Sequence, residues 1–144
     1  MNKKDLFDKF MAFTASVHRV THELTKDVKL ELNTVTPVQY SILEYIAVSQ
    51  PVTPSQVSDC QHMSMPNTSR ELKKLSEKNL IEKFSDTKDR RKQYIRLSKD
   101  GEIMMNKAFK CTEIQFLNRI QNRSEEDLED INRALDTLHT KLFY

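Results

Sequence analysis

Glycine is almost missing from this chain of 144 residues, which has one glycine, Gly101, and four prolines. Glycine-rich phosphate loops and dinucleotide-binding fingerprints need several glycines in a short segment, so the chain has neither. It also lacks an apolar run of about 18 residues, the length that a membrane-spanning helix requires. The first residues, Met1 to Asp5, lead into an amphipathic pattern and not into the apolar part of a signal peptide. We therefore expect a cytoplasmic protein.

Groups that carry catalysis or bind metal are also scarce. The two cysteines, Cys60 and Cys111, form neither a disulfide framework nor a zinc knuckle, and both fall on apolar helix faces, which predicts buried, inert thiols. His18 and His22 share a helix face, but no third ligand is near in sequence, so we interpret them as polar interface residues. No catalytic triad or paired-carboxylate set has supporting context. We expect no metal, no cofactor and no enzymatic activity.

Charge is plentiful and unevenly distributed, although the net charge is only +2. Residues 33–69 contain no lysine or arginine, whereas residues 70–96 contain ten of them against five acids. Residues 111–144 are net acidic. A positive block in an otherwise balanced chain is typical of a surface that binds a polyanion, and a solvated helix face is the alternative.

The first helix is predicted to be longer than the domain that contains it. Apolar residues at steps of three and four predict a helix over residues 5–32, with one stripe formed by Leu6, Phe10, Phe13, Val17, Val20, Leu24, Val28 and Leu32. Such a helix is about 42 Å long, whereas a compact domain of this size is about 37 Å across. The stripe therefore needs a cover from outside the domain. The last helix adds a second stripe, formed by Leu128, Ile131, Leu135, Leu138 and Leu142.

Helix-start signals repeat in the middle of the chain. Thr36-Pro37-Val38-Gln39 and Thr53-Pro54-Ser55-Gln56 each combine a capping threonine, a proline at the first helical position and a glutamine that closes a capping box. A third helix is predicted from Ser64 to Lys78, and Asn79 after it tolerates the left-handed conformation of a helix end.

A hairpin is predicted after this third helix. Residues 80–84 and 93–97 alternate apolar and polar side chains around a charged loop, residues 85–92. Ser98 caps a helix that runs to about Arg123, and Ser124 caps the last one. The predicted fold class is mainly α with a small β-hairpin wing: a winged helix-turn-helix flanked by N- and C-terminal dimerisation helices.

The third helix has the composition of a DNA recognition helix. A helix fits the major groove of duplex DNA, and residues near its N-terminus reach the base edges. We expect Asn67 to read adenine, Arg70 to read guanine or contact phosphate, and the lysines to contact phosphate. Plain capping is the alternative for the short polar residues. The candidate DNA-binding residues are Ser64, Asn67, Thr68, Ser69, Arg70, Lys73 and Lys74.

The hairpin loop offers a second set of candidate DNA-binding residues: Lys88, Asp89, Arg90, Arg91 and Lys92. A guanidinium on a thin ribbon can enter a narrow minor groove, where the negative potential is enhanced. Asp89 repels phosphate, but at two residues from Arg91 it is placed to orient that arginine. A disordered, solvated loop is the alternative.

Three segments of this region resemble MarR-type regulators. SRELKKLSEKNLI, residues 69–81, is similar to their recognition helix and the turn after it. DTKDRR, residues 86–91, resembles their wing with its Asp-x-Arg signature, here Asp89 and Arg91. LSKDG, residues 97–101, looks like the strand-to-helix junction that follows. The resemblance is dense over residues 36–101 and departs at Asn79, where the family usually has glycine.

The resemblance implies a homodimeric winged helix-turn-helix transcriptional regulator, most often a repressor that a small ligand releases. One MarR-like domain would span residues 1–144, with a DNA-binding part at 33–98 and dimerisation parts at 5–32 and 99–144. Its partners would be double-stranded DNA with a pseudo-palindromic operator, a second copy of the chain and a small-molecule effector, with no membrane.

The resemblance also places a ligand pocket where the first and fifth helices meet the winged helix. The candidate pocket residues are Phe13, Val17, Tyr40, Ile103 and Phe109, for which a place in the core is the alternative. A different function stays open: a winged-helix adaptor or ligand-binding module that does not read DNA. Lysine and arginine residues on both the third helix and the hairpin loop favour DNA binding.

Overall fold

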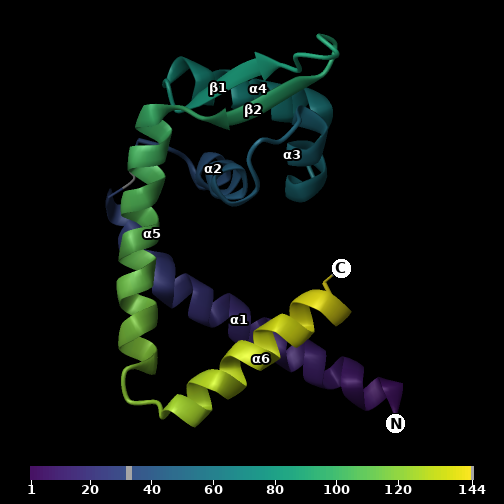
Figure 1. The fold of residues 1–144 in the computed structure, drawn as a ribbon, viewed down its shortest axis with the longest axis vertical. Helices are drawn as coiled ribbons and strands as arrows, with labels where there is room; N and C mark the ends of the chain where they lie inside the picture. Colours follow the sequence, from purple (N-terminus) through teal and green to yellow (C-terminus); the bar gives the residue numbers. More distant parts are fainter. Residues whose placement is uncertain (32–33, 144) are drawn as a thin grey trace. The chain divides into compact units, whose positions relative to one another are not determined.

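The computed structural model describes residues 1–31 and 34–143, so Leu32 of the predicted stripe lies outside the described residues. The elements follow the predicted order (Figure 1). They are α1 (Lys3–Glu31), α2 (Pro37–Ser49), α3 (Pro54–Gln61), α4 (Met65–Glu77), β1 (Ile81–Ser85), β2 (Gln93–Leu97), α5 (Lys99–Ile120) and α6 (Glu125–Lys141). The fold is mostly helical with one antiparallel hairpin, which confirms the predicted fold class.

The chain divides into two compact units, and α1 and α5 each contribute to both. Met1–Leu24 and Cys111–Tyr144 form one unit, here called the helical unit. Thr25–Lys110 form the other, here called the winged-helix unit. Among the described residues, no helix combines the length and the apolar character needed to cross a membrane.

The helical unit brings α1 and α6 together and leaves much of their apolar surface open. Arg119 pairs with Glu23 at 3.5 Å, and the rings of Phe10 and Phe143 lie 6.5 Å apart. Ser124 caps α6 as predicted, because its hydroxyl accepts from the backbone N–H of Asp127 at 3.1 Å. No residue of α6 is buried, although the helix carries the predicted stripe. Parts of both predicted stripes remain exposed in a single chain: Leu6, Phe13 and Val17 on α1, and Ile131 and Leu135 on α6 with Leu142 at its C-terminal cap.

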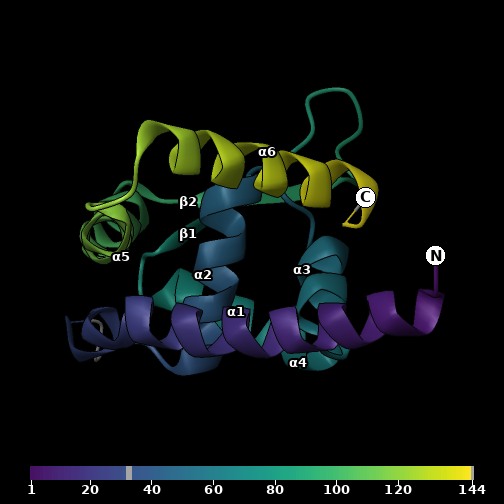
Figure 2. The same cartoon turned by 90° about the horizontal axis from the view of Figure 1, so that it is seen from below.

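The winged-helix unit contains the hydrophobic core. In both predicted capping boxes the threonine hydroxyl accepts from the glutamine N–H at 3.2 Å, and the glutamine side chain accepts in return. Figure 2 shows α2 and α3 with the hairpin behind them. The largest fully buried side chains of this unit come from every one of its elements except β1: Val28, Ile42, Leu43, Ile46, Val52, Val57, Leu72, Leu75, Ile95 and Met105.

A short third strand segment, which the sequence pattern did not predict, joins the hairpin. β1 and β2 pair antiparallel from Ile81 opposite Leu97 to Ser85 opposite Gln93. Val52 adds a single bridge to Ile95, with N···O distances of 3.0 and 2.7 Å. One paired residue between a proline and a capping threonine is too short to show the period of a strand.

The interpretation of Cys60 as a buried thiol is wrong. Its side chain is exposed, because the eight-residue α3 enters the core only through Val57 and Ser58. Cys111 is half-buried.

The start of α5 lies directly against the turn between α4 and β1. Asn79 adopts the left-handed conformation that its sequence predicts, with φ of 58°. Ser98 donates its backbone N–H to Leu80 O at 3.0 Å and its hydroxyl to Asn79 O at 2.6 Å. A Cβ on Gly101 would lie only 2.0 Å from Leu80 O. The single glycine is therefore where two backbone segments touch.

Candidate nucleic-acid interface

Helix α4 turns one face to the core and the other to solvent. Ser64 caps it by accepting the backbone N–H of Asn67 at 3.3 Å, and Pro66 occupies the first turn. Thr68, Leu72 and Leu75 are spaced by four and three residues and form the buried face. The remaining candidates on α4 are exposed: Ser64, Asn67, Ser69, Arg70, Lys73 and Lys74.

Thr68 differs from the other predicted contacts, because it has no exposed surface. Its hydroxyl donates to Ser64 O at 2.9 Å, one turn earlier in the same helix. A side chain in this position cannot reach a groove of DNA. Thr68 is a core residue whose hydroxyl bonds within the helix.

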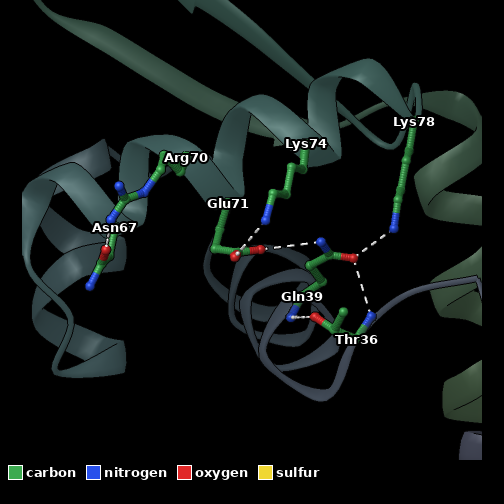
Figure 3. A network of polar contacts seen from close by, with 7 residues as sticks. All are labelled: Thr36, Gln39, Asn67, Arg70, Glu71, Lys74 and Lys78. Atoms are coloured by element: carbon green, nitrogen blue, oxygen red, sulfur yellow. Dashed lines mark hydrogen bonds and ion pairs between the residues drawn. The ribbon is translucent and has the colours of Figure 1, made fainter.

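Two contacts order the exposed face of α4 (Figure 3). Arg70 Nη2 donates to Asn67 Oδ1, one turn earlier. Lys74 Nζ lies 3.4 Å from Glu71 Oε1. Both contacts join residues three apart, which are neighbours on a helix surface. Arg70 and Lys74 therefore each have a defined partner on α4 in the absence of a ligand.

A buried amide ties α4 to the start of α2 (Figure 3). Gln39 is 2% exposed, and its Nε2 donates to Glu71 Oε2 at 3.2 Å. Its Oε1 accepts from Lys78 Nζ at 2.7 Å as well as from the backbone of Thr36. Sequence analysis found Gln39 only as part of a capping box, because no local pattern reveals partners 32 and 39 residues away.

Lys78 is held by the protein itself. Besides Gln39, its ammonium donates to the backbone oxygen of Thr34 at 2.7 Å. The charge that ends α4 is therefore directed at the start of α2. Lys78 counts toward the positive block in the sequence, but its position is that of a structural lysine.

The hairpin loop is closed by its own hydrogen bonds. Asp86 N donates to Lys92 O at 2.9 Å, and Lys92 N donates to Asp89 O at 3.0 Å. Asp86 also accepts the backbone N–H of Lys88 at 2.8 Å. The lysines and arginines of this loop that are predicted to bind DNA are all exposed: Lys88, Arg90, Arg91 and Lys92. They project from a turn that is closed by its own hydrogen bonds.

Asp89 makes the contact that its spacing from Arg91 suggested. Its carboxylate accepts from Arg91 Nε at 3.1 Å, from Nη2 at 3.4 Å and from the backbone N–H at 3.1 Å. The side-chain hydrogen bond, and after it the backbone one, lowers the pKa of Asp89 below its usual value. The carboxylate is therefore ionised at neutral pH, and it fixes the direction of the guanidinium.

The stem below this loop is stiffened by aromatic and ionic contacts. The rings of Phe84 and Tyr94 stack with centroids 5.8 Å apart. The Arg96 guanidinium lies 4.6 Å from the centre of the Phe84 ring and donates to Glu82 Oε2 at 3.1 Å. Cross-strand contacts of this kind stabilise a hairpin. These contacts therefore stabilise the two strands that carry the loop.

Comparison with known proteins supports the resemblance seen in the sequence. The MarR family model matches residues 33–92, from just before α2 to the end of the hairpin loop. The resemblance is therefore confirmed over these residues.

Similarity to known proteins extends beyond the matched segment. An uncharacterised HTH-type transcriptional regulator of Staphylococcus aureus (strain MRSA252) is 24% identical over 143 residues, 96% of this chain and 93% of that protein. A MarR family protein from Bacillus stearothermophilus has the same fold, with a TM-score of 0.82 and 16% identity over 100% of this chain and 99% of that one.

The protein MepR of S. aureus is a third similar protein. A MepR mutant bound to an oligodeoxyribonucleotide matches with a TM-score of 0.59 and 22% identity, covering 90% of this chain and 97% of that one. MepR bound to ethidium bromide matches with a TM-score of 0.66 and 23% identity, covering 90% and 96%. At these identities the two structures show a shared fold.

The predicted ligand-pocket residues of this chain are divided between its two units. Phe13 and Val17 belong to the helical unit and line an apolar groove of about 600 Å³, together with Thr14, Leu135, Asp136, Leu138, His139 and Phe143. Tyr40, Ile103 and Phe109 belong to the winged-helix unit, where Ile103 is exposed and the two aromatic residues are half-buried. A pocket formed by all five stays a prediction.

The histidines noted in the sequence lie on the surface of α1. His18 and His22 are both exposed. Within residues 1–31 and 34–143, no three His, Cys, Asp or Glu side chains are grouped so that they could hold a metal ion.

Proposed function

We propose that the chain is a sequence-specific regulator that binds double-stranded DNA in the cytoplasm as a homodimer and acts as a ligand-responsive repressor. The observation that carries this proposal is the pair of exposed basic surfaces on one compact unit, at α4 and at the hairpin loop. In each, the protein's own acceptors orient an arginine: Asn67 orients Arg70, and Asp89 orients Arg91. Oriented guanidinium groups suit the recognition of bases and phosphates.

In this proposal α4 enters the major groove and the loop enters the adjacent minor groove. The DNA-binding part is residues 33–98, and the dimerisation parts are residues 5–32 and 99–144. The exposed apolar residues of α1 and α6 support dimerisation, because a monomer would leave both stripes in water. A two-fold dimer reads two half-sites, so the operator is expected to be pseudo-palindromic.

Two structures of MepR support the partners assigned here. One MepR mutant is bound to an oligodeoxyribonucleotide, which supports DNA as the ligand of the shared fold. MepR is also bound to ethidium bromide, a flat hydrophobic cation, which supports a small-molecule effector. For this chain we therefore propose a small-molecule effector as well as DNA.

Fluorescence anisotropy with a labelled random duplex tests DNA binding. At physiological salt we expect a dissociation constant of about 1–100 μM, which falls steeply at lower salt because phosphate contacts release counterions. Lys73→Ala should weaken binding to all sequences and lower the salt slope by about one. Lys107→Ala removes the same charge from the exposed surface of α5 and serves as the control. No binding at high micromolar protein would instead favour an adaptor without DNA readout.

Replacing Asp89 with alanine tests the role of the loop contact. Removing a negative charge near DNA should tighten binding on Coulomb's law alone. We expect weaker binding, because Arg91 loses the acceptor for its Nε, Nη2 and backbone N–H. The measurement is operator affinity at physiological salt, with Glu77→Ala as the control that removes an equal charge from an exposed position of the same unit. Tighter binding by Asp89→Ala would show that the loop is only a basic tether.

A further inference from the structure

The contact between Asn67 and Arg70 constrains what α4 can recognise. Both side chains are exposed in the first two turns of the helix, where base edges would lie if the proposed function holds. Arg70 Nη2 donates to Asn67 Oδ1 across one turn. A guanidinium has donors and no acceptor, so the amide must turn its oxygen toward Arg70. The assignment of oxygen and nitrogen in Asn67 therefore follows from chemistry.

Glu71, the acidic residue nearest to Arg70 in sequence, is already engaged elsewhere. One of its carboxylate oxygens accepts from the buried Gln39 at 3.2 Å, and the other faces Lys74 at 3.4 Å. Figure 3 shows this carboxylate directed toward α2, while Arg70 and Asn67 meet nearer the N-terminal end of α4. The buried amide thus keeps the carboxylate away from Arg70. Asn67 is the acceptor that the structure gives to this arginine.

The contact joins the two side chains into one group that faces a ligand mainly with donors. Arg70 keeps its remaining N–H groups and Asn67 its –NH2 group, while the Asn67 oxygen, which has two lone pairs, already accepts from Arg70. Reading adenine would take that shared oxygen as the acceptor for the adenine amino group, as well as a donor for N7. Guanine offers two acceptors, N7 and O6, on its major-groove edge.

We propose that Asn67 and Arg70 act as one unit that selects a single guanine in each half-site. This deepens the proposed function and rests on it. Arg70 is the reading residue, and Asn67 is the positioning residue that aims it. The proposal replaces the expectation that Asn67 reads adenine by itself.

A double-mutant cycle on a selected operator tests the unit. The operator is first enriched from a random duplex library with the full-length wild-type protein. Arg70→Ala should lower operator affinity about 10- to 100-fold and remove the preference for guanine at one position. Asn67→Ala should weaken the preference at that same position, and the double variant should bind within about twofold of Arg70→Ala. Operator DNA with 7-deazaguanine at that position should bind the wild type more weakly and leave Arg70→Ala unaffected.

Two further variants distinguish the orientation of Arg70 by Asn67 from sequence-independent effects on DNA affinity. Asn67→Asp keeps an acceptor for Arg70, so it should retain the guanine preference while its charge weakens binding to every duplex. Lys73→Ala should weaken binding without changing any base preference. Because Asn67 and Arg70 are exposed, thermal stability should not change in their variants.

The outcomes distinguish the unit from the function on which it rests. Penalties that multiply in the double variant, with Asn67→Ala relaxing an adenine position of its own, would overturn the unit and leave the DNA-binding function intact. Failure to enrich any operator, together with no binding to random duplex, would overturn both.

Discussion

Replacing Gly101 with alanine is expected to lower the free energy of unfolding of the winged-helix unit by about 3 kcal/mol or more. The new Cβ would lie 2.0 Å from Leu80 O, and that oxygen is backbone that accepts the N–H of Ser98. A flexible side chain could move away from such a contact. Here the turn after α4 or the first turn of α5 must shift, and the hydrogen bonds of Ser98 must distort with it.

Chemical denaturation at one fixed protein concentration measures this effect, because dimer formation makes stability depend on concentration. Lys99→Ala is the matched control: it changes an exposed residue in the same turn of α5 and should alter stability by no more than about 0.5 kcal/mol. Equal stability of the two variants would show that the approach of α5 to Leu80 O is not a constraint in solution.

Leu135→Asp is expected to raise the dissociation constant of the dimer about 100-fold or more. Leu135 is 57% exposed in the single chain and lines the apolar groove with Phe13 and Val17. On a free surface an aspartate there would be harmless. In a dimer that covers the groove, the same change buries an unpaired charge, which costs about 3 kcal/mol or more.

Sedimentation equilibrium across nanomolar to micromolar protein measures the dissociation constant. Thr137→Asp is the matched control, because it adds the same charge to α6 two residues away and off the apolar stripe. We expect it to behave as the wild type. A wild-type protein that sediments as a folded monomer of 16.9 kDa at micromolar concentration would contradict the homodimer itself.

Local signals in the sequence predicted the element boundaries well. The two capping boxes and the caps at Ser64 and Ser124 act within one helical turn, so the residues that form them are adjacent in sequence. The left-handed Asn79 is equally local. The pairing of Val52 with Ile95 depends on a strand that is distant in sequence, so no local pattern around Val52 predicts it.

The candidate interface was predicted less completely, because helix faces and buried partners are decided by tertiary packing. Composition placed Thr68 among the groove residues, but it lies in line with Leu72 and Leu75 on the core face. The contact of Gln39 with Glu71 could not be predicted, because it forms only when the fold brings α2 and α4 side by side. The Asp89–Arg91 contact was predictable, since both residues lie in one short turn.

The junction at Leu80 has a mechanical consequence. Ser98 bonds to both Asn79 and Leu80, and Gly101 leaves no gap between α5 and that turn. The first turn of α5 therefore cannot swing or slide alone; it must carry the C-terminal end of α4 with it. Within the winged-helix unit, we therefore expect a tilt of the first turns of α5 to move α4, the helix that bears Asn67 and Arg70.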